Sequence, residues 1–138
     1  MRKFCVLFCS AAALLLSACS QEESTLRVSQ ILIGSGTNES EEIVVYKDSF
    51  LPSDKTFYAH VFTEGFSEPE EVTGAWWYVP QDRKIFETSV EVTPQYPVAK
   101  FVLTNTTERW AAGEYLFTVF RGEKQLGEKS ISVLERGE

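Results

Sequence analysis

Short runs in which apolar and polar positions alternate cover most of the chain after residue 25, and they constrain its fold more than any other feature. In residues 113–120, for example, Tyr115, Phe117 and Val119 occupy every second position. A period of two residues predicts β-strands, and no helical period of useful length follows Thr25. The expected strands are residues 26–33, 43–47, 56–63, 72–79, 84–92, 98–104, 113–120 and 130–134.

The spacing of these segments predicts the architecture. Seven or eight short strands that recur about every 8–12 residues are typical of an all-β, antiparallel β-sandwich. The chain is also long enough to bury roughly two-thirds of its unfolded surface in one core. The side chains expected to face that core are Trp76, Tyr78, Phe101, Leu103, Tyr115, Phe117, Ile131 and Val133.

The first residues have the order of an export signal. Arg2 and Lys3 precede an apolar stretch at residues 4–16 that contains Cys5 and Cys9. This stretch is too short to cross a hydrocarbon core of about 30 Å, which needs roughly 20 helical residues. A positive start followed by a short apolar run predicts a secretory signal peptide.

The signal ends in Leu16-Ser17-Ala18-Cys19, which resembles the lipobox of bacterial lipoproteins. The resemblance implies cleavage before Cys19, a diacylglyceryl group on its sulfur and acylation of the new amino terminus. Two or more acyl chains anchor a protein stably where a single chain is marginal. The first expected partner is therefore a lipid bilayer, bound through acylated Cys19. The alternative is a short membrane-seeking helix with an ordinary cysteine.

The residue after the cysteine bears on the location. In lipoproteins of double-membrane bacteria an aspartate there directs retention at the inner membrane, and this chain has Ser20 instead. The resemblance therefore implies anchoring in the outer membrane, facing the periplasm or the cell surface. The expected organisation is a signal peptide at residues 1–18, a lipidated tether at 19–25 and a β-sandwich domain at 26–138.

A second resemblance concerns the sandwich itself. The chain contains Trp110-x-x-Gly113-x-Tyr115, in which a large aromatic residue and a turning glycine precede a strand, and it also contains Trp76-x-Tyr78. These segments resemble the immunoglobulin-like domains of bacterial envelope proteins. The resemblance implies an immunoglobulin-like β-sandwich, without the cysteine pair of antibody domains. It implies no activity, because function lies in sites carried by a fold.

Charge and motifs narrow the function further. The chain has 13 basic and 20 acidic residues, a formal net charge of −7, which argues against a nucleic-acid partner. His60 is the single histidine, and it is expected to be a partly exposed strand residue. Serine-nucleophile, phosphate-loop and dinucleotide motifs are absent from the sequence. The sequence therefore predicts no catalytic residue, no cofactor and no enzyme.

Two acidic runs are candidate calcium sites. Carboxylate oxygens from such loops are the ligands that calcium prefers, but the regular spacing of a calcium-binding loop is missing. Solvated acidic loops are therefore predicted, and no metal site. The residues concerned are Glu39, Glu41 and Glu42 in one run and Glu68, Glu70 and Glu71 in the other.

A patch for a partner is predicted on an outer sheet face. If Trp76 points inward, Trp77 points outward, because neighbouring strand residues face opposite sides. Ala75, Val79 and Leu116 are expected on the same face, joined by Leu134 if no bulge at Gly127 shifts the register. An exposed apolar patch with a tryptophan is typical of an interface. The alternative is that a loop or residues 26–33 cover this face.

Three functions remain open at this point. The favoured one is a non-catalytic, membrane-anchored binding or assembly module with a protein partner. The second is an accessory lipoprotein of a secretion or pilus machine. The third is a hydrolase of envelope polymers, which needs two carboxyl groups converging in a cleft at about 5–10 Å.

Overall fold

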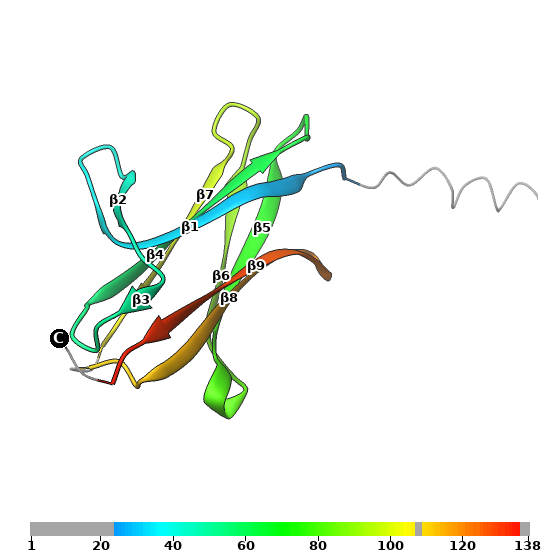
Figure 1. Cartoon of the computed structure of the whole chain (residues 1–138). Helices are drawn as coiled ribbons and strands as arrows, with labels where there is room; N and C mark the ends of the chain where they lie inside the picture. Colours follow the sequence, from blue (N-terminus) through cyan, green and yellow to red (C-terminus); the bar gives the residue numbers. More distant parts are fainter. Residues whose placement is uncertain (1–23, 107–108, 136–138) are drawn as a thin grey trace, which may run out of the picture.

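The computed structural model describes residues 24–106 and 109–135, and its cartoon is shown in Figure 1. The described residues form nine strands and one short 3-10 turn, η2 (Val79–Gln81). The strands are β1 (Arg27–Thr37), β2 (Ile43–Tyr46), β3 (Ser49–Phe50), β4 (Thr56–Glu64), β5 (Glu70–Tyr78), β6 (Arg83–Val92), β7 (Val98–Thr104), β8 (Gly113–Arg121) and β9 (Lys124–Val133).

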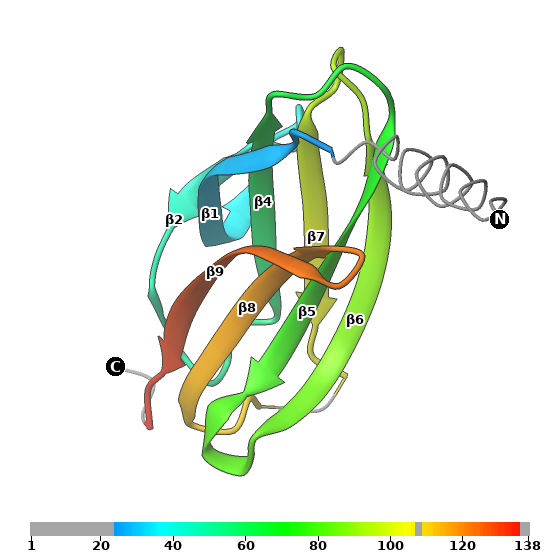
Figure 2. The same cartoon turned by 90° about the vertical axis from the view of Figure 1, so that its right-hand side faces the viewer.

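The strands form two sheets that pack face to face, which confirms the predicted β-sandwich (Figure 2). One sheet has four strands in the order β2-β1-β4-β7, and the other has five in the order β3-β9-β8-β5-β6. Every pairing is antiparallel except that of β3 with β9, which is parallel.

Alternating side chains from both sheets fill the space between them. Trp76 is fully buried at the centre of this core, with its ring centroid 4.6 Å from that of Phe117 and 5.9 Å from that of Phe57. All of the predicted core residues are buried except Tyr78, which is half-buried and packs against the core. The period of two therefore identified the inward faces correctly.

The structure differs from the sequence prediction in the short and polar strands. β3 was missed because two residues show no alternation. β9 begins at Lys124 rather than Ser130, since its first half is polar and contains a register shift opposite Val119 and Phe120. The hairpin between β8 and β9 closes through Gly122, which takes a left-handed φ of 62°.

The chain enters the domain at one end of the sandwich. This end carries the β4–β5 and β6–β7 connections (Figures 1 and 2). The Ser24 hydroxyl lies 2.7 Å from both carboxylate oxygens of Glu70, and the Thr25 hydroxyl donates to the Gly65 carbonyl. Ser24 and Thr25, assigned to the tether by sequence, are thus hydrogen-bonded to the domain. Cys19 lies outside the described residues.

Candidate functional site

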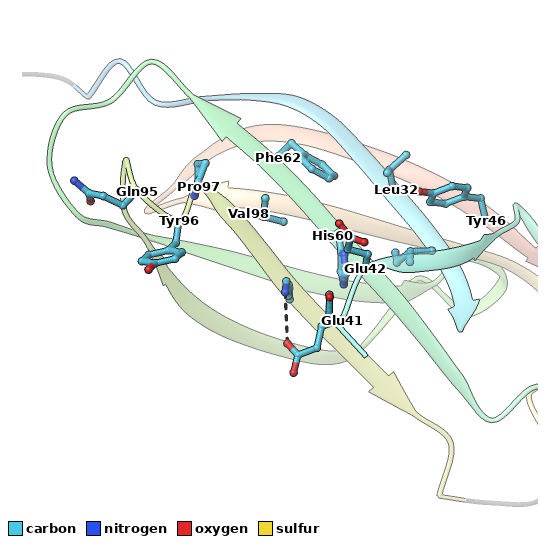
Figure 3. A pocket seen from close by; sticks show the side chains of 13 residues that line it. Leu32, Glu41, Glu42, Tyr46, His60, Phe62, Gln95, Tyr96, Pro97 and Val98 are labelled. Carbon is cyan, nitrogen blue, oxygen red and sulfur yellow. Dashed lines mark hydrogen bonds and ion pairs between the residues drawn. The ribbon is translucent and has the colours of Figure 1, made fainter. Parts of the chain in front are cut away.

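A groove crosses the outer face of the four-stranded sheet, the face turned away from the core (Figure 3). Its volume is about 910 Å³. We call it the outer groove. Its floor consists of Leu32, His60, Phe62 and Val98, and Lys100 lies beside the floor. One wall consists of residues 40–43 with Tyr46, and the other wall consists of residues 95–97.

Strand register places the floor residues side by side. Phe57, Ala59 and Val61 of β4 point into the core, so His60 and Phe62 point to the outer face. His60 is paired with Leu32 on one side and Lys100 on the other, while Phe62 is paired with Val98. Three strands thus contribute one continuous surface.

The first wall is a tight turn between β1 and β2. The Asn38 side-chain oxygen accepts hydrogen bonds from the backbone N–H groups of Ser40 at 2.9 Å and Glu42 at 3.0 Å. Glu41 takes a left-handed φ of 64°, and its carboxylate lies 3.4 Å from Lys100 Nζ. This ion pair joins the turn to β7 on the His60 side of the sheet, as the dashed line in Figure 3 shows.

The second wall belongs to the β6–β7 connection. The backbone groups of Thr93 and Tyr96 bond to each other, and the Thr93 hydroxyl accepts a further bond from the Tyr96 N–H at 3.0 Å. The Pro97 carbonyl accepts bonds from both the N–H and the hydroxyl of Thr63. This ordered loop holds the Tyr96 ring out at the end of the groove, where it is 80 % exposed.

His60 is the polar residue of the floor, and the structure corrects the sequence interpretation of it. The residue is only 5 % exposed, because the 38–42 turn and the groove walls surround it. Among the described residues neither ring nitrogen is held by a hydrogen bond. Burial lowers the pKa of His60 from its ordinary value, the nearby Lys100 lowers it further, and Glu41 opposes them. The imidazole at the groove floor is therefore neutral at pH 7.

This lowered pKa predicts how stability depends on pH. Below the unfolded-state pKa of about 6.5, the unfolded chain binds a proton that the folded His60 does not. Stability should therefore fall as the pH decreases from 6.5 towards the folded pKa, by at most about 1.4 kcal/mol per pH unit. Urea unfolding from pH 7.5 to pH 5.5 measures this slope. His60→Gln should flatten it, and an unchanged slope in that variant would contradict the assignment.

The predicted Trp77 patch lies on the opposite outer face, that of the five-stranded sheet. Trp77 and Leu116 are register partners on β5 and β8, and both are half-buried. Val79 and Leu134 are 40 % and 42 % exposed. On β8 and β9, Leu116 is paired with Ser130, and Glu114 is paired with Ser132. The Glu114–Ser132 pair therefore lies between Leu116 and Leu134. The structure therefore brings Trp77 and Leu116 together and leaves Leu134 apart.

Two details of this face differ from the sequence prediction. Ala75 was expected to be exposed beside Trp77, but it is buried opposite Thr118. The indole Nε1 of Trp77 donates to the Thr118 hydroxyl at 3.1 Å, which ties the Trp77 ring to β8. Residues 26–33 do not cover the face, because β1 belongs to the other sheet.

The acidic runs have partners of their own. Glu70 accepts from Arg121 Nε at 2.7 Å as well as from Ser24, and Glu42 accepts from the Asn38 amide at 3.2 Å. Within residues 24–106 and 109–135, no three His, Cys, Asp or Glu side chains are grouped so that they could hold a metal ion. The same part of the chain contains no helix of the length and apolarity that a membrane crossing requires.

Sequence reasoning missed the outer groove. A usable signal was present in residues 56–63, where both faces of the strand carry apolar or aromatic side chains rather than one. A strand that is apolar on both sides indicates that its outer face is covered as well. The sequence of the β1–β2 turn gave no indication that this turn lies over the outer face of β4.

Comparison with known proteins bears on the fold. No protein-family model matches the chain, and no curated protein sequence matches it. Among solved structures, an immunoglobulin-like protein from Pseudomonas aeruginosa is similar, with 21 % identity and a TM-score of 0.56 over 83 % of this chain and 98 % of that one. An alkylpurine DNA glycosylase from Pseudomonas fluorescens is 10 % identical with a TM-score of 0.52, and the match covers 80 % of this chain and 31 % of the glycosylase. The domain is an immunoglobulin-like β-sandwich.

Proposed function

We propose that this chain is a non-catalytic lipoprotein of the bacterial outer membrane, a binding module held on the bilayer by acyl chains on Cys19. The observation that carries the proposal is the order of the first 19 residues, which places two basic residues, an apolar run and Leu16-Ser17-Ala18-Cys19 ahead of the domain. Four residues, 20–23, separate Cys19 from Ser24. The five steps from Cys19 to Ser24 span at most about 18 Å, so the domain stays within that distance of the anchor.

The sandwich supports a binding role. The outer groove has the size of a ligand site and combines an apolar floor with a few polar groups, which is the usual composition of binding pockets. His60, the described residue best suited to acid–base chemistry, has no hydrogen-bonded carboxylate or nucleophile beside it. This arrangement favours recognition over catalysis.

The experiment that tests the anchor compares three cysteine variants expressed in a double-membrane bacterium. Cys19→Ser should abolish incorporation of radiolabelled palmitate and leave an uncleaved precursor, because the thiol is the acceptor of the diacylglyceryl group. Cys5→Ser and Cys9→Ser are matched controls within the apolar run, and they should be acylated and cleaved normally. The proposal would be contradicted if the Cys19→Ser chain were acylated normally. It would also be contradicted if acylation were lost in Cys5→Ser or Cys9→Ser but not in Cys19→Ser.

A further inference from the structure

We propose that the outer groove binds an extended segment of a protein partner in which a basic side chain lies two residues from an apolar one. The inference deepens the proposed function and rests on its statement that the chain is a binding module. It is carried by three features of the groove: a floor imidazole that has no hydrogen-bond partner among the described residues, an excess of negative charge on one wall, and an apolar floor.

The imidazole points to a polar ligand. His60 lines the groove, is 5 % exposed and has no hydrogen-bond partner among the described residues. A neutral imidazole has one donor and one acceptor nitrogen, and neither is among the fully buried nitrogens of the described residues, so a ligand in the groove can reach them. A peptide backbone supplies both complementary groups, a carbonyl and an N–H, along every residue of an extended segment.

The wall charges indicate the sign of the ligand. Glu41 is paired with Lys100, so these two charges offset each other across the groove. Glu42 also lines the groove, and within the described part of the chain its carboxylate accepts only a neutral amide, from Asn38. With His60 neutral, the lining of the groove has a net negative charge. A basic side chain beside Glu42 would complement it.

The floor and the rims indicate the rest of the ligand. Leu32, Phe62 and Val98 form an apolar surface next to His60, and Tyr46 and Tyr96 stand at opposite ends of the groove, 61 % and 80 % exposed (Figure 3). Apolar anchors with surrounding aromatic residues are typical of protein recognition sites. In an extended peptide the side chains of residues i and i+2 point the same way, so one segment presents an apolar and a basic group to the groove together.

The test uses three defined ligands and the full chain purified from the membrane in detergent micelles. The first ligand is acetyl-Ala-Phe-Ala-Lys-Ala-amide, the second has glutamine in place of lysine, and the third is a tetramer of N-acetylglucosamine. Backbone and imidazole nitrogen resonances are followed by NMR during titration. The lysine peptide should bind most tightly and should shift the resonances of His60, Phe62 and Val98.

Two variants of the same turn make the test specific. Glu42→Gln should weaken binding of the lysine peptide by up to about fivefold, the upper end of the range for one exposed ion pair, and should leave binding of the glutamine peptide unchanged. Glu39→Gln is the matched control, because Glu39 is exposed in the same turn but does not line the groove. It should bind the lysine peptide as the unmodified chain does.

Each other result would overturn the inference. Equal affinity for the two peptides would remove the charge argument, tighter binding of the sugar tetramer would assign the groove to a glycan, and shifts around Trp77 would move the site to the other sheet. An absence of shifts with every ligand would also overturn it. None of these results bears on the acylation of Cys19, so failure of the groove and failure of the anchor are distinguishable.

Discussion

Replacement of Trp76 by alanine is expected to lower the free energy of unfolding by about 3–5 kcal/mol, the usual cost of truncating a buried large aromatic residue. The side chain is fully buried and packs against Phe57 and Phe117. Among the described residues its indole Nε1 has no hydrogen-bond partner, so its stabilising effect comes from packing. Urea denaturation of the unmodified and substituted chains measures the difference.

Two further variants test whether the loss of stability in Trp76→Ala comes from lost packing in the core. Trp76→Phe should recover part of the loss, because it keeps aromatic contacts and removes the unpartnered N–H. Phe86→Ala is a surface control on the neighbouring strand, since Phe86 is paired with Trp76 but is 43 % exposed. It should cost less than about 1 kcal/mol. A Trp76→Ala chain as stable as the Phe86→Ala chain would contradict the placement of the core.

The second large effect is expected at Gly74 of β5, where two core rings pack directly against the backbone. A Cβ atom added here would lie 2.8 Å from two carbons of the Phe101 ring and 2.9 Å from Phe117 Cζ. Both rings are buried between the sheets and have little room to move. Gly74→Ala should therefore cost about 1–3 kcal/mol through overpacking, and Gly74→Val should cost more.

Gly36 is the matched control for this experiment. It lies in β1, and a Cβ atom there would meet only the Val45 side chain, at 3.4 Å. Gly36→Ala should change the free energy of unfolding by less than about 1 kcal/mol, since an alanine at a compatible position reduces the entropy of the unfolded chain. If Gly74→Ala proved as well tolerated as Gly36→Ala in thermal unfolding, the packing of Phe101 against the five-stranded sheet would be wrong.

Much of the fold could be predicted because strand alternation is a local property. Tyr115, Phe117 and Val119 are predicted to point inward from their two-residue spacing alone, because this spacing does not depend on the rest of the chain. β3 could not be found in this way. Its two residues form a strand only because Phe50 lies beside Val133, which is a contact between distant parts of the sequence.

The candidate sites show the same limit. The pairing of Trp77 with Leu116 followed from parity on two strands that the immunoglobulin-like resemblance places side by side. The distance of Leu134 from Leu116 depended on the register of β9 against β8, which the sequence does not show. His60 was expected to be partly exposed because its own strand carries no sign of the 38–42 turn. That turn covers it through the ion pair of Glu41 with Lys100, 59 residues apart in the chain.

The most direct test of the central claim is the intact mass of the chain extracted from the outer membrane of a cell that expresses it, with fragmentation of its first peptide. The account predicts a chain that begins at Cys19, carries a diacylglyceryl group on the sulfur and a fatty acyl group on the amino terminus, and retains Ser20. A chain that begins at Met1, or one with an unmodified Cys19 thiol, would contradict it.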